Sequence, residues 1–270
     1  MDRAVMEHDG HSTSADVEID GQPRVLAGIP HPLSMVYGGG GVYGIAYGFG
    51  VAQGLLAEGV PVAGAPALGT SAGSWVAGAV ALGLTYADIS GMRAPSVPTR
   101  RAGALYEIAH ELFGDARHPL VAVSAVAVRT RRRHILDGAR YPLADLAAAS
   151  SAVPGLLPPH RIEGRLYVDG GMWSATSVDA AHDADAVIVV APLAGRVMGP
   201  MGRTAGFLLD RELRRWRARY PGKRITTIRP DRAMARLAGR NPLSLFDADR
   251  ARAVYPLAVE QGRRWGAELA

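Results

Sequence analysis

The chain has 270 residues, of which 48% are hydrophobic and 20% charged, and this composition is typical of one large globular domain or two small ones. It contains no cysteine, which excludes disulfides, thiolate zinc sites and a cysteine nucleophile. The formal net charge of +5 favours anionic partners such as phospholipid head groups or nucleic acid, or simply describes a solvated basic surface.

The polar N-terminal segment, residues 1–23, lacks the apolar core of a signal peptide, so we expect a mobile tail followed by one domain over residues 24–270. Residues 59–87 carry no charge and are long enough to raise the question of a membrane span. Pro61, Pro66 and a cluster of glycine and serine interrupt this run. It therefore predicts a buried strand, a turn and a helix, and by default we expect a cytoplasmic protein.

Predicted strands and helices alternate along the chain. The run at 32–37 predicts a strand that leads into a glycine loop, and the next helix follows from apolar residues at helical spacing: Ile45, Phe49, Ala52, Leu55 and Leu56. Further strands are predicted at 60–68, 120–128, 165–169, 185–193 and 223–230, and further helices at 73–84, 141–153 and 245–269. The alternation predicts a three-layer α/β/α sandwich with a largely parallel central sheet. The segments 90–103 and 193–206 are predicted to be surface loops.

Gly69, Ser71 and Gly73 have the spacing G-x-S-x-G, which often presents a nucleophilic serine in hydrolases. The motif alone is weak in a chain with 33 glycines, but a predicted strand precedes it and a small-residue helix follows it. The glycines permit a sharp turn, and the helix N-terminus directs partial positive charge at Ser71. The alternative is a serine that merely caps the helix.

A second glycine-rich turn, at Gly39, Gly40 and Gly41, lies between the first predicted strand and helix. Its backbone N–H groups can receive the oxyanion of a tetrahedral intermediate. Gly39, Gly41 and Gly44 also fit the dinucleotide fingerprint G-x-G-x-x-G. That fingerprint requires an acidic residue at the end of the next strand, where this chain has the serine motif instead, and so the oxyanion site is favoured.

A serine nucleophile requires a base. An α/β-hydrolase supplies a histidine late in the chain, but the last of the eight histidines here is His182, before the final three predicted elements. Asp169, in contrast, ends a predicted strand and is followed by Gly170 and Gly171. A partly desolvated carboxylate directed at the hydroxyl can act as general base. Taken alone, Asp-Gly-Gly describes a plain turn equally well.

The order of these motifs resembles that of the patatin-like phospholipase family, from about Met35 to Gly171. The family's glycine loop reads G-G-G-x-[RK]-G, and residues 39–44 match all but one position. The serine motif matches at 69–73 and the aspartate motif at 169–171, after the similar stretch ASSAVPGLLPP. The resemblance implies a lipid acyl hydrolase with a Ser71–Asp169 dyad and no catalytic histidine. We expect no metal and no other cofactor.

Tyr43 stands where family members usually carry a basic residue. Tyrosine donates a hydrogen bond but brings no charge, so the resemblance implies acyl-ester hydrolysis more strongly than a phospholipid substrate. We expect Asp169 to take the proton from Ser71 as it attacks an ester carbonyl, and Gly39–Gly41 to receive the oxyanion. Water activated by Asp169 then hydrolyses the acyl-enzyme.

Two basic segments, 128–136 and 210–224, either contact an anionic membrane surface or form solvated faces. We expect a lipid or acyl-ester substrate and no nucleic-acid partner. Residues Met198–Met201 form either a lid over the acyl site or an ordinary loop. Two other functions stay open: a histidine-dependent α/β-hydrolase esterase, and a non-catalytic lipid- or nucleotide-binding protein on the same scaffold.

Overall fold

The computed structural model describes residues 17–18, 31–93, 97–181, 183–195, 197 and 199–269. Apart from residues 17–18, the predicted N-terminal tail lies outside the described residues, and so do His182 and Met198.

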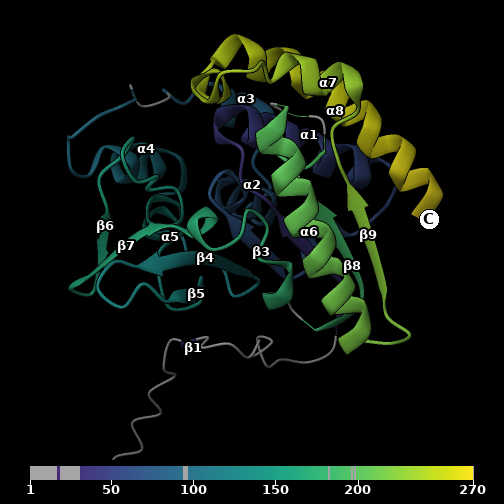
Figure 1. Cartoon of the computed structure of the whole chain (residues 1–270), viewed down its shortest axis with the longest axis horizontal. Helices are drawn as coiled ribbons and strands as arrows, with labels where there is room; N and C mark the ends of the chain where they lie inside the picture. Colours follow the sequence, from purple (N-terminus) through teal and green to yellow (C-terminus); the bar gives the residue numbers. More distant parts are fainter. Residues whose placement is uncertain are drawn as a thin grey trace, which may run out of the picture.

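A mixed sheet lies at the centre of the molecule (Figure 1). Its strands are β1 (Val17–Glu18), β2 (His31–Tyr37), β3 (Ala67–Thr70), β4 (Val121–Ala127), β5 (Arg133–Asp137), β6 (His160–Ile162), β7 (Arg165–Asp169), β8 (Ala184–Val190) and β9 (Arg224–Ile228). The main order is β1-β5-β4-β3-β2-β8-β9. Strands β4, β3, β2, β8 and β9 run parallel, whereas β5 and β7 both pair antiparallel with β4. The carboxyl ends of the parallel strands therefore share one edge of the sheet.

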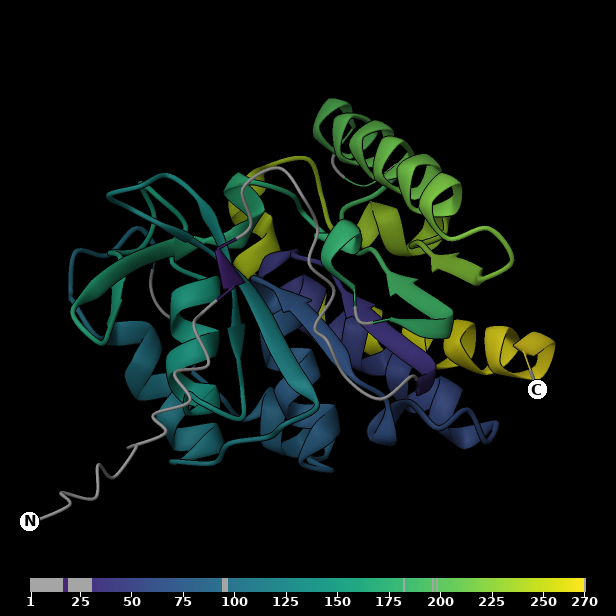
Figure 2. The ribbon, with the colours of Figure 1, turned by 90° about the horizontal axis from the view of Figure 1, so that it is seen from below.

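Helices cover both faces of this sheet, unequally (Figure 2). One face carries α1 (Gly41–Ala57), α2 (Ala72–Ala81), α4 (Ala104–Phe113) and α5 (Leu143–Ser150), with α8 (Ala248–Leu269) packed along α1. The other face carries α6 (Pro200–Arg219). The short elements are α3 (Tyr86–Ser90), α7 (Arg232–Leu237), η1 (Val62–Gly64), η2 (Gly170–Met172), η3 (Val178–Ala180) and η4 (Pro242–Phe246).

The alternation of side chains along β2 explains the two helical layers. Met35 and Tyr37 pack into the larger core with α1 and α2, whereas Val36 points to the opposite core with Leu209 and Leu213 of α6. Successive residues of a strand face opposite sides of the sheet, so a central strand covered on both faces is apolar throughout. The predicted three-layer α/β/α sandwich with a largely parallel sheet is confirmed.

The uncharged run at 59–87 folds as the short elements predicted from its prolines, namely η1, β3 and α2. In the part of the chain that the structure describes, no helix is both long enough and apolar enough to cross a bilayer. The predicted strand at 60–68 is wrong in its first half, because the stretch between Pro61 and Pro66 forms a 3-10 turn and β3 begins at Ala67.

Two other predictions are corrected by the fold. The predicted loop at 193–206 ends early, because Pro200 starts α6 and fits the first turn of a helix. Arg133 belongs to no solvated basic face, since it lies on β5 with a side chain that is 1% exposed and pairs with Asp179. A buried guanidinium requires such a partner, and the bidentate contact supplies it.

Candidate active site

Ser71 occupies a sharp turn between β3 and α2 at the carboxyl edge of the sheet. Its φ of 53° and ψ of −122° are uncommon for a residue with a side chain and indicate local backbone strain. Ser74 holds the turn, since its N–H and its hydroxyl both donate to the Ser71 carbonyl, at 2.9 and 2.6 Å. Gly73 is required because a Cβ there would lie 1.9 Å from the Tyr37 carbonyl oxygen. This geometry leaves the Ser71 side chain half-buried.

A buried serine on another helix holds the same turn from below. The backbone N–H of Ser71 donates to Ser150 Oγ at 2.9 Å, and this hydroxyl donates to the Ser124 carbonyl in β4 at 2.7 Å. Both of these serines are fully buried. Sequence reasoning missed Ser150, although it lies in the stretch ASSAVPGLLPP that resembles the family. Because its N–H is bound to Ser150, the Ser71 amide is not a free donor for an oxyanion.

Asp169 is the last residue of β7. This strand pairs with β4, the strand that also accepts the Ser150 hydroxyl. Its backbone pairs with Ala125 in β4, its side chain is 4% exposed, and its Oδ1 accepts the Gly171 N–H at 2.6 Å. Burial raises the pKa of Asp169 from 3.8 to about 6. The Ser71 side chain lies near enough to the Asp169 carboxylate to lower its pKa, and the bond from Gly171 likewise acts in the direction opposite to burial.

The turn after Asp169 fits closely against β4. A Cβ on Gly170 would lie 2.2 Å from the Ser124 carbonyl oxygen, so no other residue is accommodated without a shift of the backbone. That carbonyl also accepts the Ser150 hydroxyl. Ser124 thus contacts both the segment that holds Ser71 and the turn that follows Asp169.

The predicted glycine loop lies beside the serine. A Cβ on Gly39 would be 3.2 Å from Ser71 Cβ. The Gly39 N–H donates to the Ala175 carbonyl at 2.9 Å, whereas the N–H groups of Gly40 and Gly41 have no hydrogen-bond partner among the described residues. Unpaired N–H groups are expected where a helix begins, and they carry its positive dipole end. Two of the three predicted oxyanion donors are therefore available in this structure.

Tyr43, at the position where the sequence departs from the family's pattern, is fully buried and points away from the serine. Its hydroxyl donates to the Met234 carbonyl of α7 at 3.0 Å, and its ring stacks on Tyr47. The Tyr47 hydroxyl in turn donates to Gln261 of α8 at 2.7 Å. The first turns of α1 are thereby tied to the C-terminal helices.

A cavity of about 420 Å³ opens above the Ser71–Asp169 pair. The glycine loop lies at its floor, and most of its wall is apolar, with side chains such as Ile45, Trp75, Ile89, Leu105, Ile108 and Leu156. Such a surface accommodates hydrocarbon in preference to polar groups. No histidine is found among the described residues that line it. Over the described residues there is also no group of three or more His, Asp or Glu side chains placed to hold a metal ion.

In fold and site, the chain is a three-layer α/β protein that brings a serine and a buried aspartate together at the carboxyl edge of its sheet. The family model described as patatin-like phospholipase matches residues 101–182. This range includes Ser150, Asp169 and Gly171. Uncharacterized NTE family proteins of Mycobacterium bovis and Mycobacterium tuberculosis are 30% identical to the chain over 198 residues. The family model and these relatives support the patatin-like phospholipase family that the motifs predicted.

The aligned region is 66% of this chain and 53% of each mycobacterial protein, so the chain spans about half the length of the curated relatives it matches. Among solved structures, VipD from Legionella pneumophila aligns with 90% of this chain and 67% of its own, with a TM-score of 0.45 and 14% sequence identity.

Proposed function

We propose that the protein is a serine acyl hydrolase that cleaves carboxylic esters of lipids, with Ser71 as the nucleophile and Asp169 as the general base. The observation that carries the proposal is the proximity of these two side chains in the lining of one apolar cavity. The match to the patatin-like phospholipase family model supports a lipid ester as the substrate.

The geometry supports a two-step reaction. With a pKa of about 6, Asp169 is ionised at neutral pH and accepts the Ser71 proton as the hydroxyl attacks the ester carbonyl. The N–H groups of Gly40 and Gly41 then donate to the oxyanion, and Gly39 joins them only if it releases Ala175. Collapse of the intermediate expels the alcohol, which takes the proton from Asp169. Water that loses a proton to Asp169 attacks the acyl-enzyme, and Asp169 returns this proton to the Ser71 oxygen as the carboxylic acid leaves.

Peripheral contact with a lipid surface is part of the proposal. Met172 and Met201 line the cavity and are also 64% and 40% exposed, so they lie at its opening. Trp173, next to Met172, is 51% exposed. Apolar side chains exposed around the opening of an acyl cavity suit a surface from which a lipid enters.

The test uses a short p-nitrophenyl ester and a fluorophosphonate probe, which labels an activated serine. We expect Ser71→Ala to abolish both hydrolysis and labelling, and Asp169→Asn to reduce hydrolysis almost as far. Ser90→Ala, which alters another serine of the cavity wall, serves as the matched control and stays active. Hydrolysis that survives Ser71→Ala contradicts the proposal, whereas loss of activity on substitution of His182 supports the histidine-dependent alternative. A wild-type protein that neither hydrolyses esters nor reacts with the probe supports a non-catalytic binding protein.

A further inference from the structure

Two arginines interrupt the apolar wall of the cavity. Arg93 and Arg252 are the cationic residues among the described residues that line it, and Asp169 at the floor is the acidic one. Arginine stays protonated in proteins, so both side chains bring a permanent positive charge to this wall. Neither charge takes part in the proposed chemistry at Ser71.

Side-chain contacts join α3 to α8, and one arginine follows α3 in the chain while the other belongs to α8. The Tyr86 ring of α3 stacks on the Tyr255 ring of α8, with centroids 3.5 Å apart and planes 2° from parallel. The Tyr86 hydroxyl also donates to the Ala251 carbonyl at 3.5 Å. Arg93 lies three residues after the end of α3, and Arg252 follows Ala251 on α8. Both residues line the same cavity.

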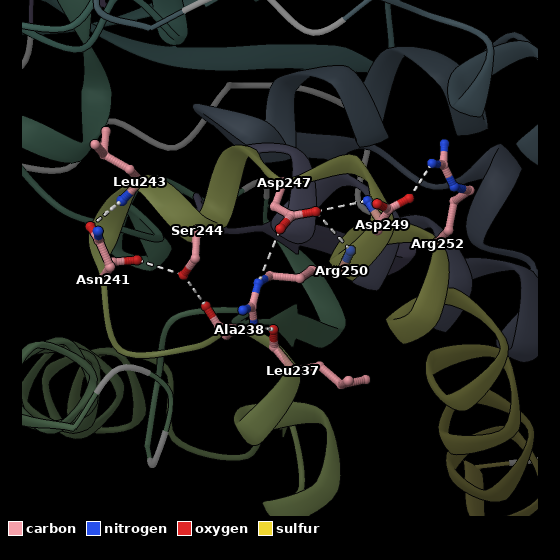
Figure 3. Close-up of polar contacts among 9 residues, drawn as sticks. All are labelled: Leu237, Ala238, Asn241, Leu243, Ser244, Asp247, Asp249, Arg250 and Arg252. Atoms are coloured by element: carbon pink, nitrogen blue, oxygen red, sulfur yellow. Dashed lines mark hydrogen bonds and ion pairs between the residues drawn. The ribbon is translucent and has the colours of Figure 1, made fainter.

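The arginines of this region differ in how firmly they are held (Figure 3). Arg250 donates to the Leu237 carbonyl at 2.9 Å and to Asp247, and so it fixes the segment between α7 and α8. Arg252 points away from those contacts and pairs with Asp249, a side chain that is 87% exposed. An exposed ion pair of this kind contributes little stability and exchanges readily for another anion.

Arg93 is exposed and has no ion pair among the described residues. A guanidinium group presents parallel N–H donors that match phosphate or carboxylate oxygens. The described part of the wall offers no acidic side chain, other than Asp169, to the cationic end of a zwitterionic head group. The wall is thus complementary to a group with net negative charge.

We propose that Arg93 and Arg252 form a subsite that binds the anionic head group of the acyl lipid and selects lipids with net negative charge over zwitterionic and neutral ones. This inference rests on the proposed function, which supplies the lipid substrate, and it adds that the substrate carries a net negative charge. It also assigns head-group contact to α3 and α8 rather than to the glycine loop, where Tyr43 faces the protein interior.

Binding is tested first, without catalysis, in the Ser71→Ala protein. Short-chain lipids are used below their aggregation concentration: dihexanoyl phosphatidic acid, dihexanoyl phosphatidylcholine and dihexanoylglycerol. Tryptophan fluorescence reports binding, because Trp75 lines the cavity. We expect the anionic lipid to bind about tenfold more tightly than the other two, and Arg93→Gln or Arg252→Gln to reduce this preference about fivefold each. Arg215→Gln, an exposed arginine of α6 that does not line the cavity, leaves it unchanged.

The active enzyme gives the second readout, the ratio of kcat/KM for the anionic and the neutral lipid. The double Arg93→Gln, Arg252→Gln variant should lose this ratio, because its kcat/KM on the anionic lipid falls toward that on dihexanoylglycerol. A preference that persists in the double variant overturns the subsite. An effect seen with anionic vesicles but not with monomeric lipids also overturns it, because the arginines then contact a membrane surface. If the wild type binds as expected but hydrolyses none of the lipids, the proposed function fails and the subsite stands.

Discussion

The backbone N–H of Ser71 donates to the hydroxyl oxygen of Ser150 at 2.9 Å, so the strained turn that carries the candidate nucleophile is held by a side chain from the end of α5. The Ser150 hydroxyl is bound in turn to β4, the strand with which Asp169 pairs. One buried hydroxyl therefore links the positions of the serine and the aspartate.

Removal of that hydroxyl should impair the chemical step more than substrate binding. We expect Ser150→Ala to lower kcat about 10- to 100-fold with KM within about twofold, because a shift of the nucleophile weakens its alignment with the ester. The unfolding free energy should fall by about 1–2 kcal/mol, since the buried Ser71 N–H loses its acceptor. Ser151→Ala is the matched control, as Ser151 Oγ accepts the Trp75 indole N–H and not the Ser71 amide. Equal losses of kcat in the two variants contradict the positioning role.

Burial of Asp169 predicts the pH dependence of hydrolysis. The carboxylate accepts a proton from Ser71 only when it is ionised, and burial raises its pKa to about 6. We therefore expect kcat/KM to rise with pH as one group ionises, with a midpoint near pH 6, and then to reach a plateau. A midpoint near pH 4 indicates a carboxylate that is exposed in solution. A midpoint that moves on substitution of His182 indicates that a histidine is the base.

The same pKa predicts how stability changes with pH. Because the folded-state pKa of Asp169 lies above its ordinary value of 3.8, the folded state holds the proton more tightly than the unfolded chain. The contribution of this group to stability is thus complete below about pH 4 and is lost as pH rises through about 6. Asp169→Asn carries no such charge. At pH 8 we expect this variant to be more stable than the wild type, on the order of 2 kcal/mol by chemical denaturation, and a difference that is equally large at pH 4 contradicts the explanation.

Tyr43 should matter for folding rather than for charge recognition. We expect Tyr43→Phe to reduce the unfolding free energy by about 1 kcal/mol through loss of the bond to the Met234 carbonyl, with kcat/KM nearly unchanged. Tyr43→Arg restores the family's usual charge but places it in a fully buried site, and it should be much less stable. Thermal unfolding and ester hydrolysis of both variants provide the test. An increase in activity on anionic lipids in Tyr43→Arg contradicts this assignment.

The exposed residues at the opening of the cavity should determine binding to lipid surfaces. Met172→Ser and Trp173→Ser together are expected to reduce co-sedimentation with phosphatidylglycerol vesicles severalfold, because they remove apolar area that enters the interface. The Ser71→Ala background prevents hydrolysis of the vesicles during the measurement. Leu257→Ser, which alters an exposed leucine of α8 outside the cavity, is the control. Equal vesicle binding by all of these variants contradicts contact at this face.

Much of the architecture can be predicted from local patterns. Strands β2, β4 and β8 are nearly continuous apolar runs, as expected for parallel strands covered on both faces, and α1 and α8 show helical spacing. We did not predict β5 because it begins with Arg133, a charged residue that is buried in the fold. The ion-pair partner of Arg133, Asp179, is distant in sequence. The N-terminal part of α6 was assigned to a loop because glycine and proline are abundant there, although proline fits the first turn of a helix.

The candidate site was predictable where its residues stand in ordered motifs, and not where contacts depend on the fold. The spacing around Ser71 and Asp169 indicated both residues, and the structure brings them together in the lining of one cavity. Their catalytic roles stay predictions. The bond from Gly39 to Ala175 joins segments that no motif connects, so the loss of one predicted oxyanion donor had no signal in the sequence. The same holds for Arg93 and Arg252, which are distant in sequence and line one cavity only in the folded chain.

The floor and one wall of the cavity come from different parts of the chain. A Cβ on Gly41 would lie 2.8 Å from the Leu245 carbonyl oxygen, so η4 rests directly on the glycine loop, and residues 242–252 continue as a wall of the cavity. This wall comes from a segment of the chain that contains neither Ser71 nor Asp169. Chemistry and substrate choice can therefore diverge separately. A lineage that exchanges residues in η4 and the start of α8 can acquire a new lipid preference while its nucleophile, base and glycine loop stay as they are.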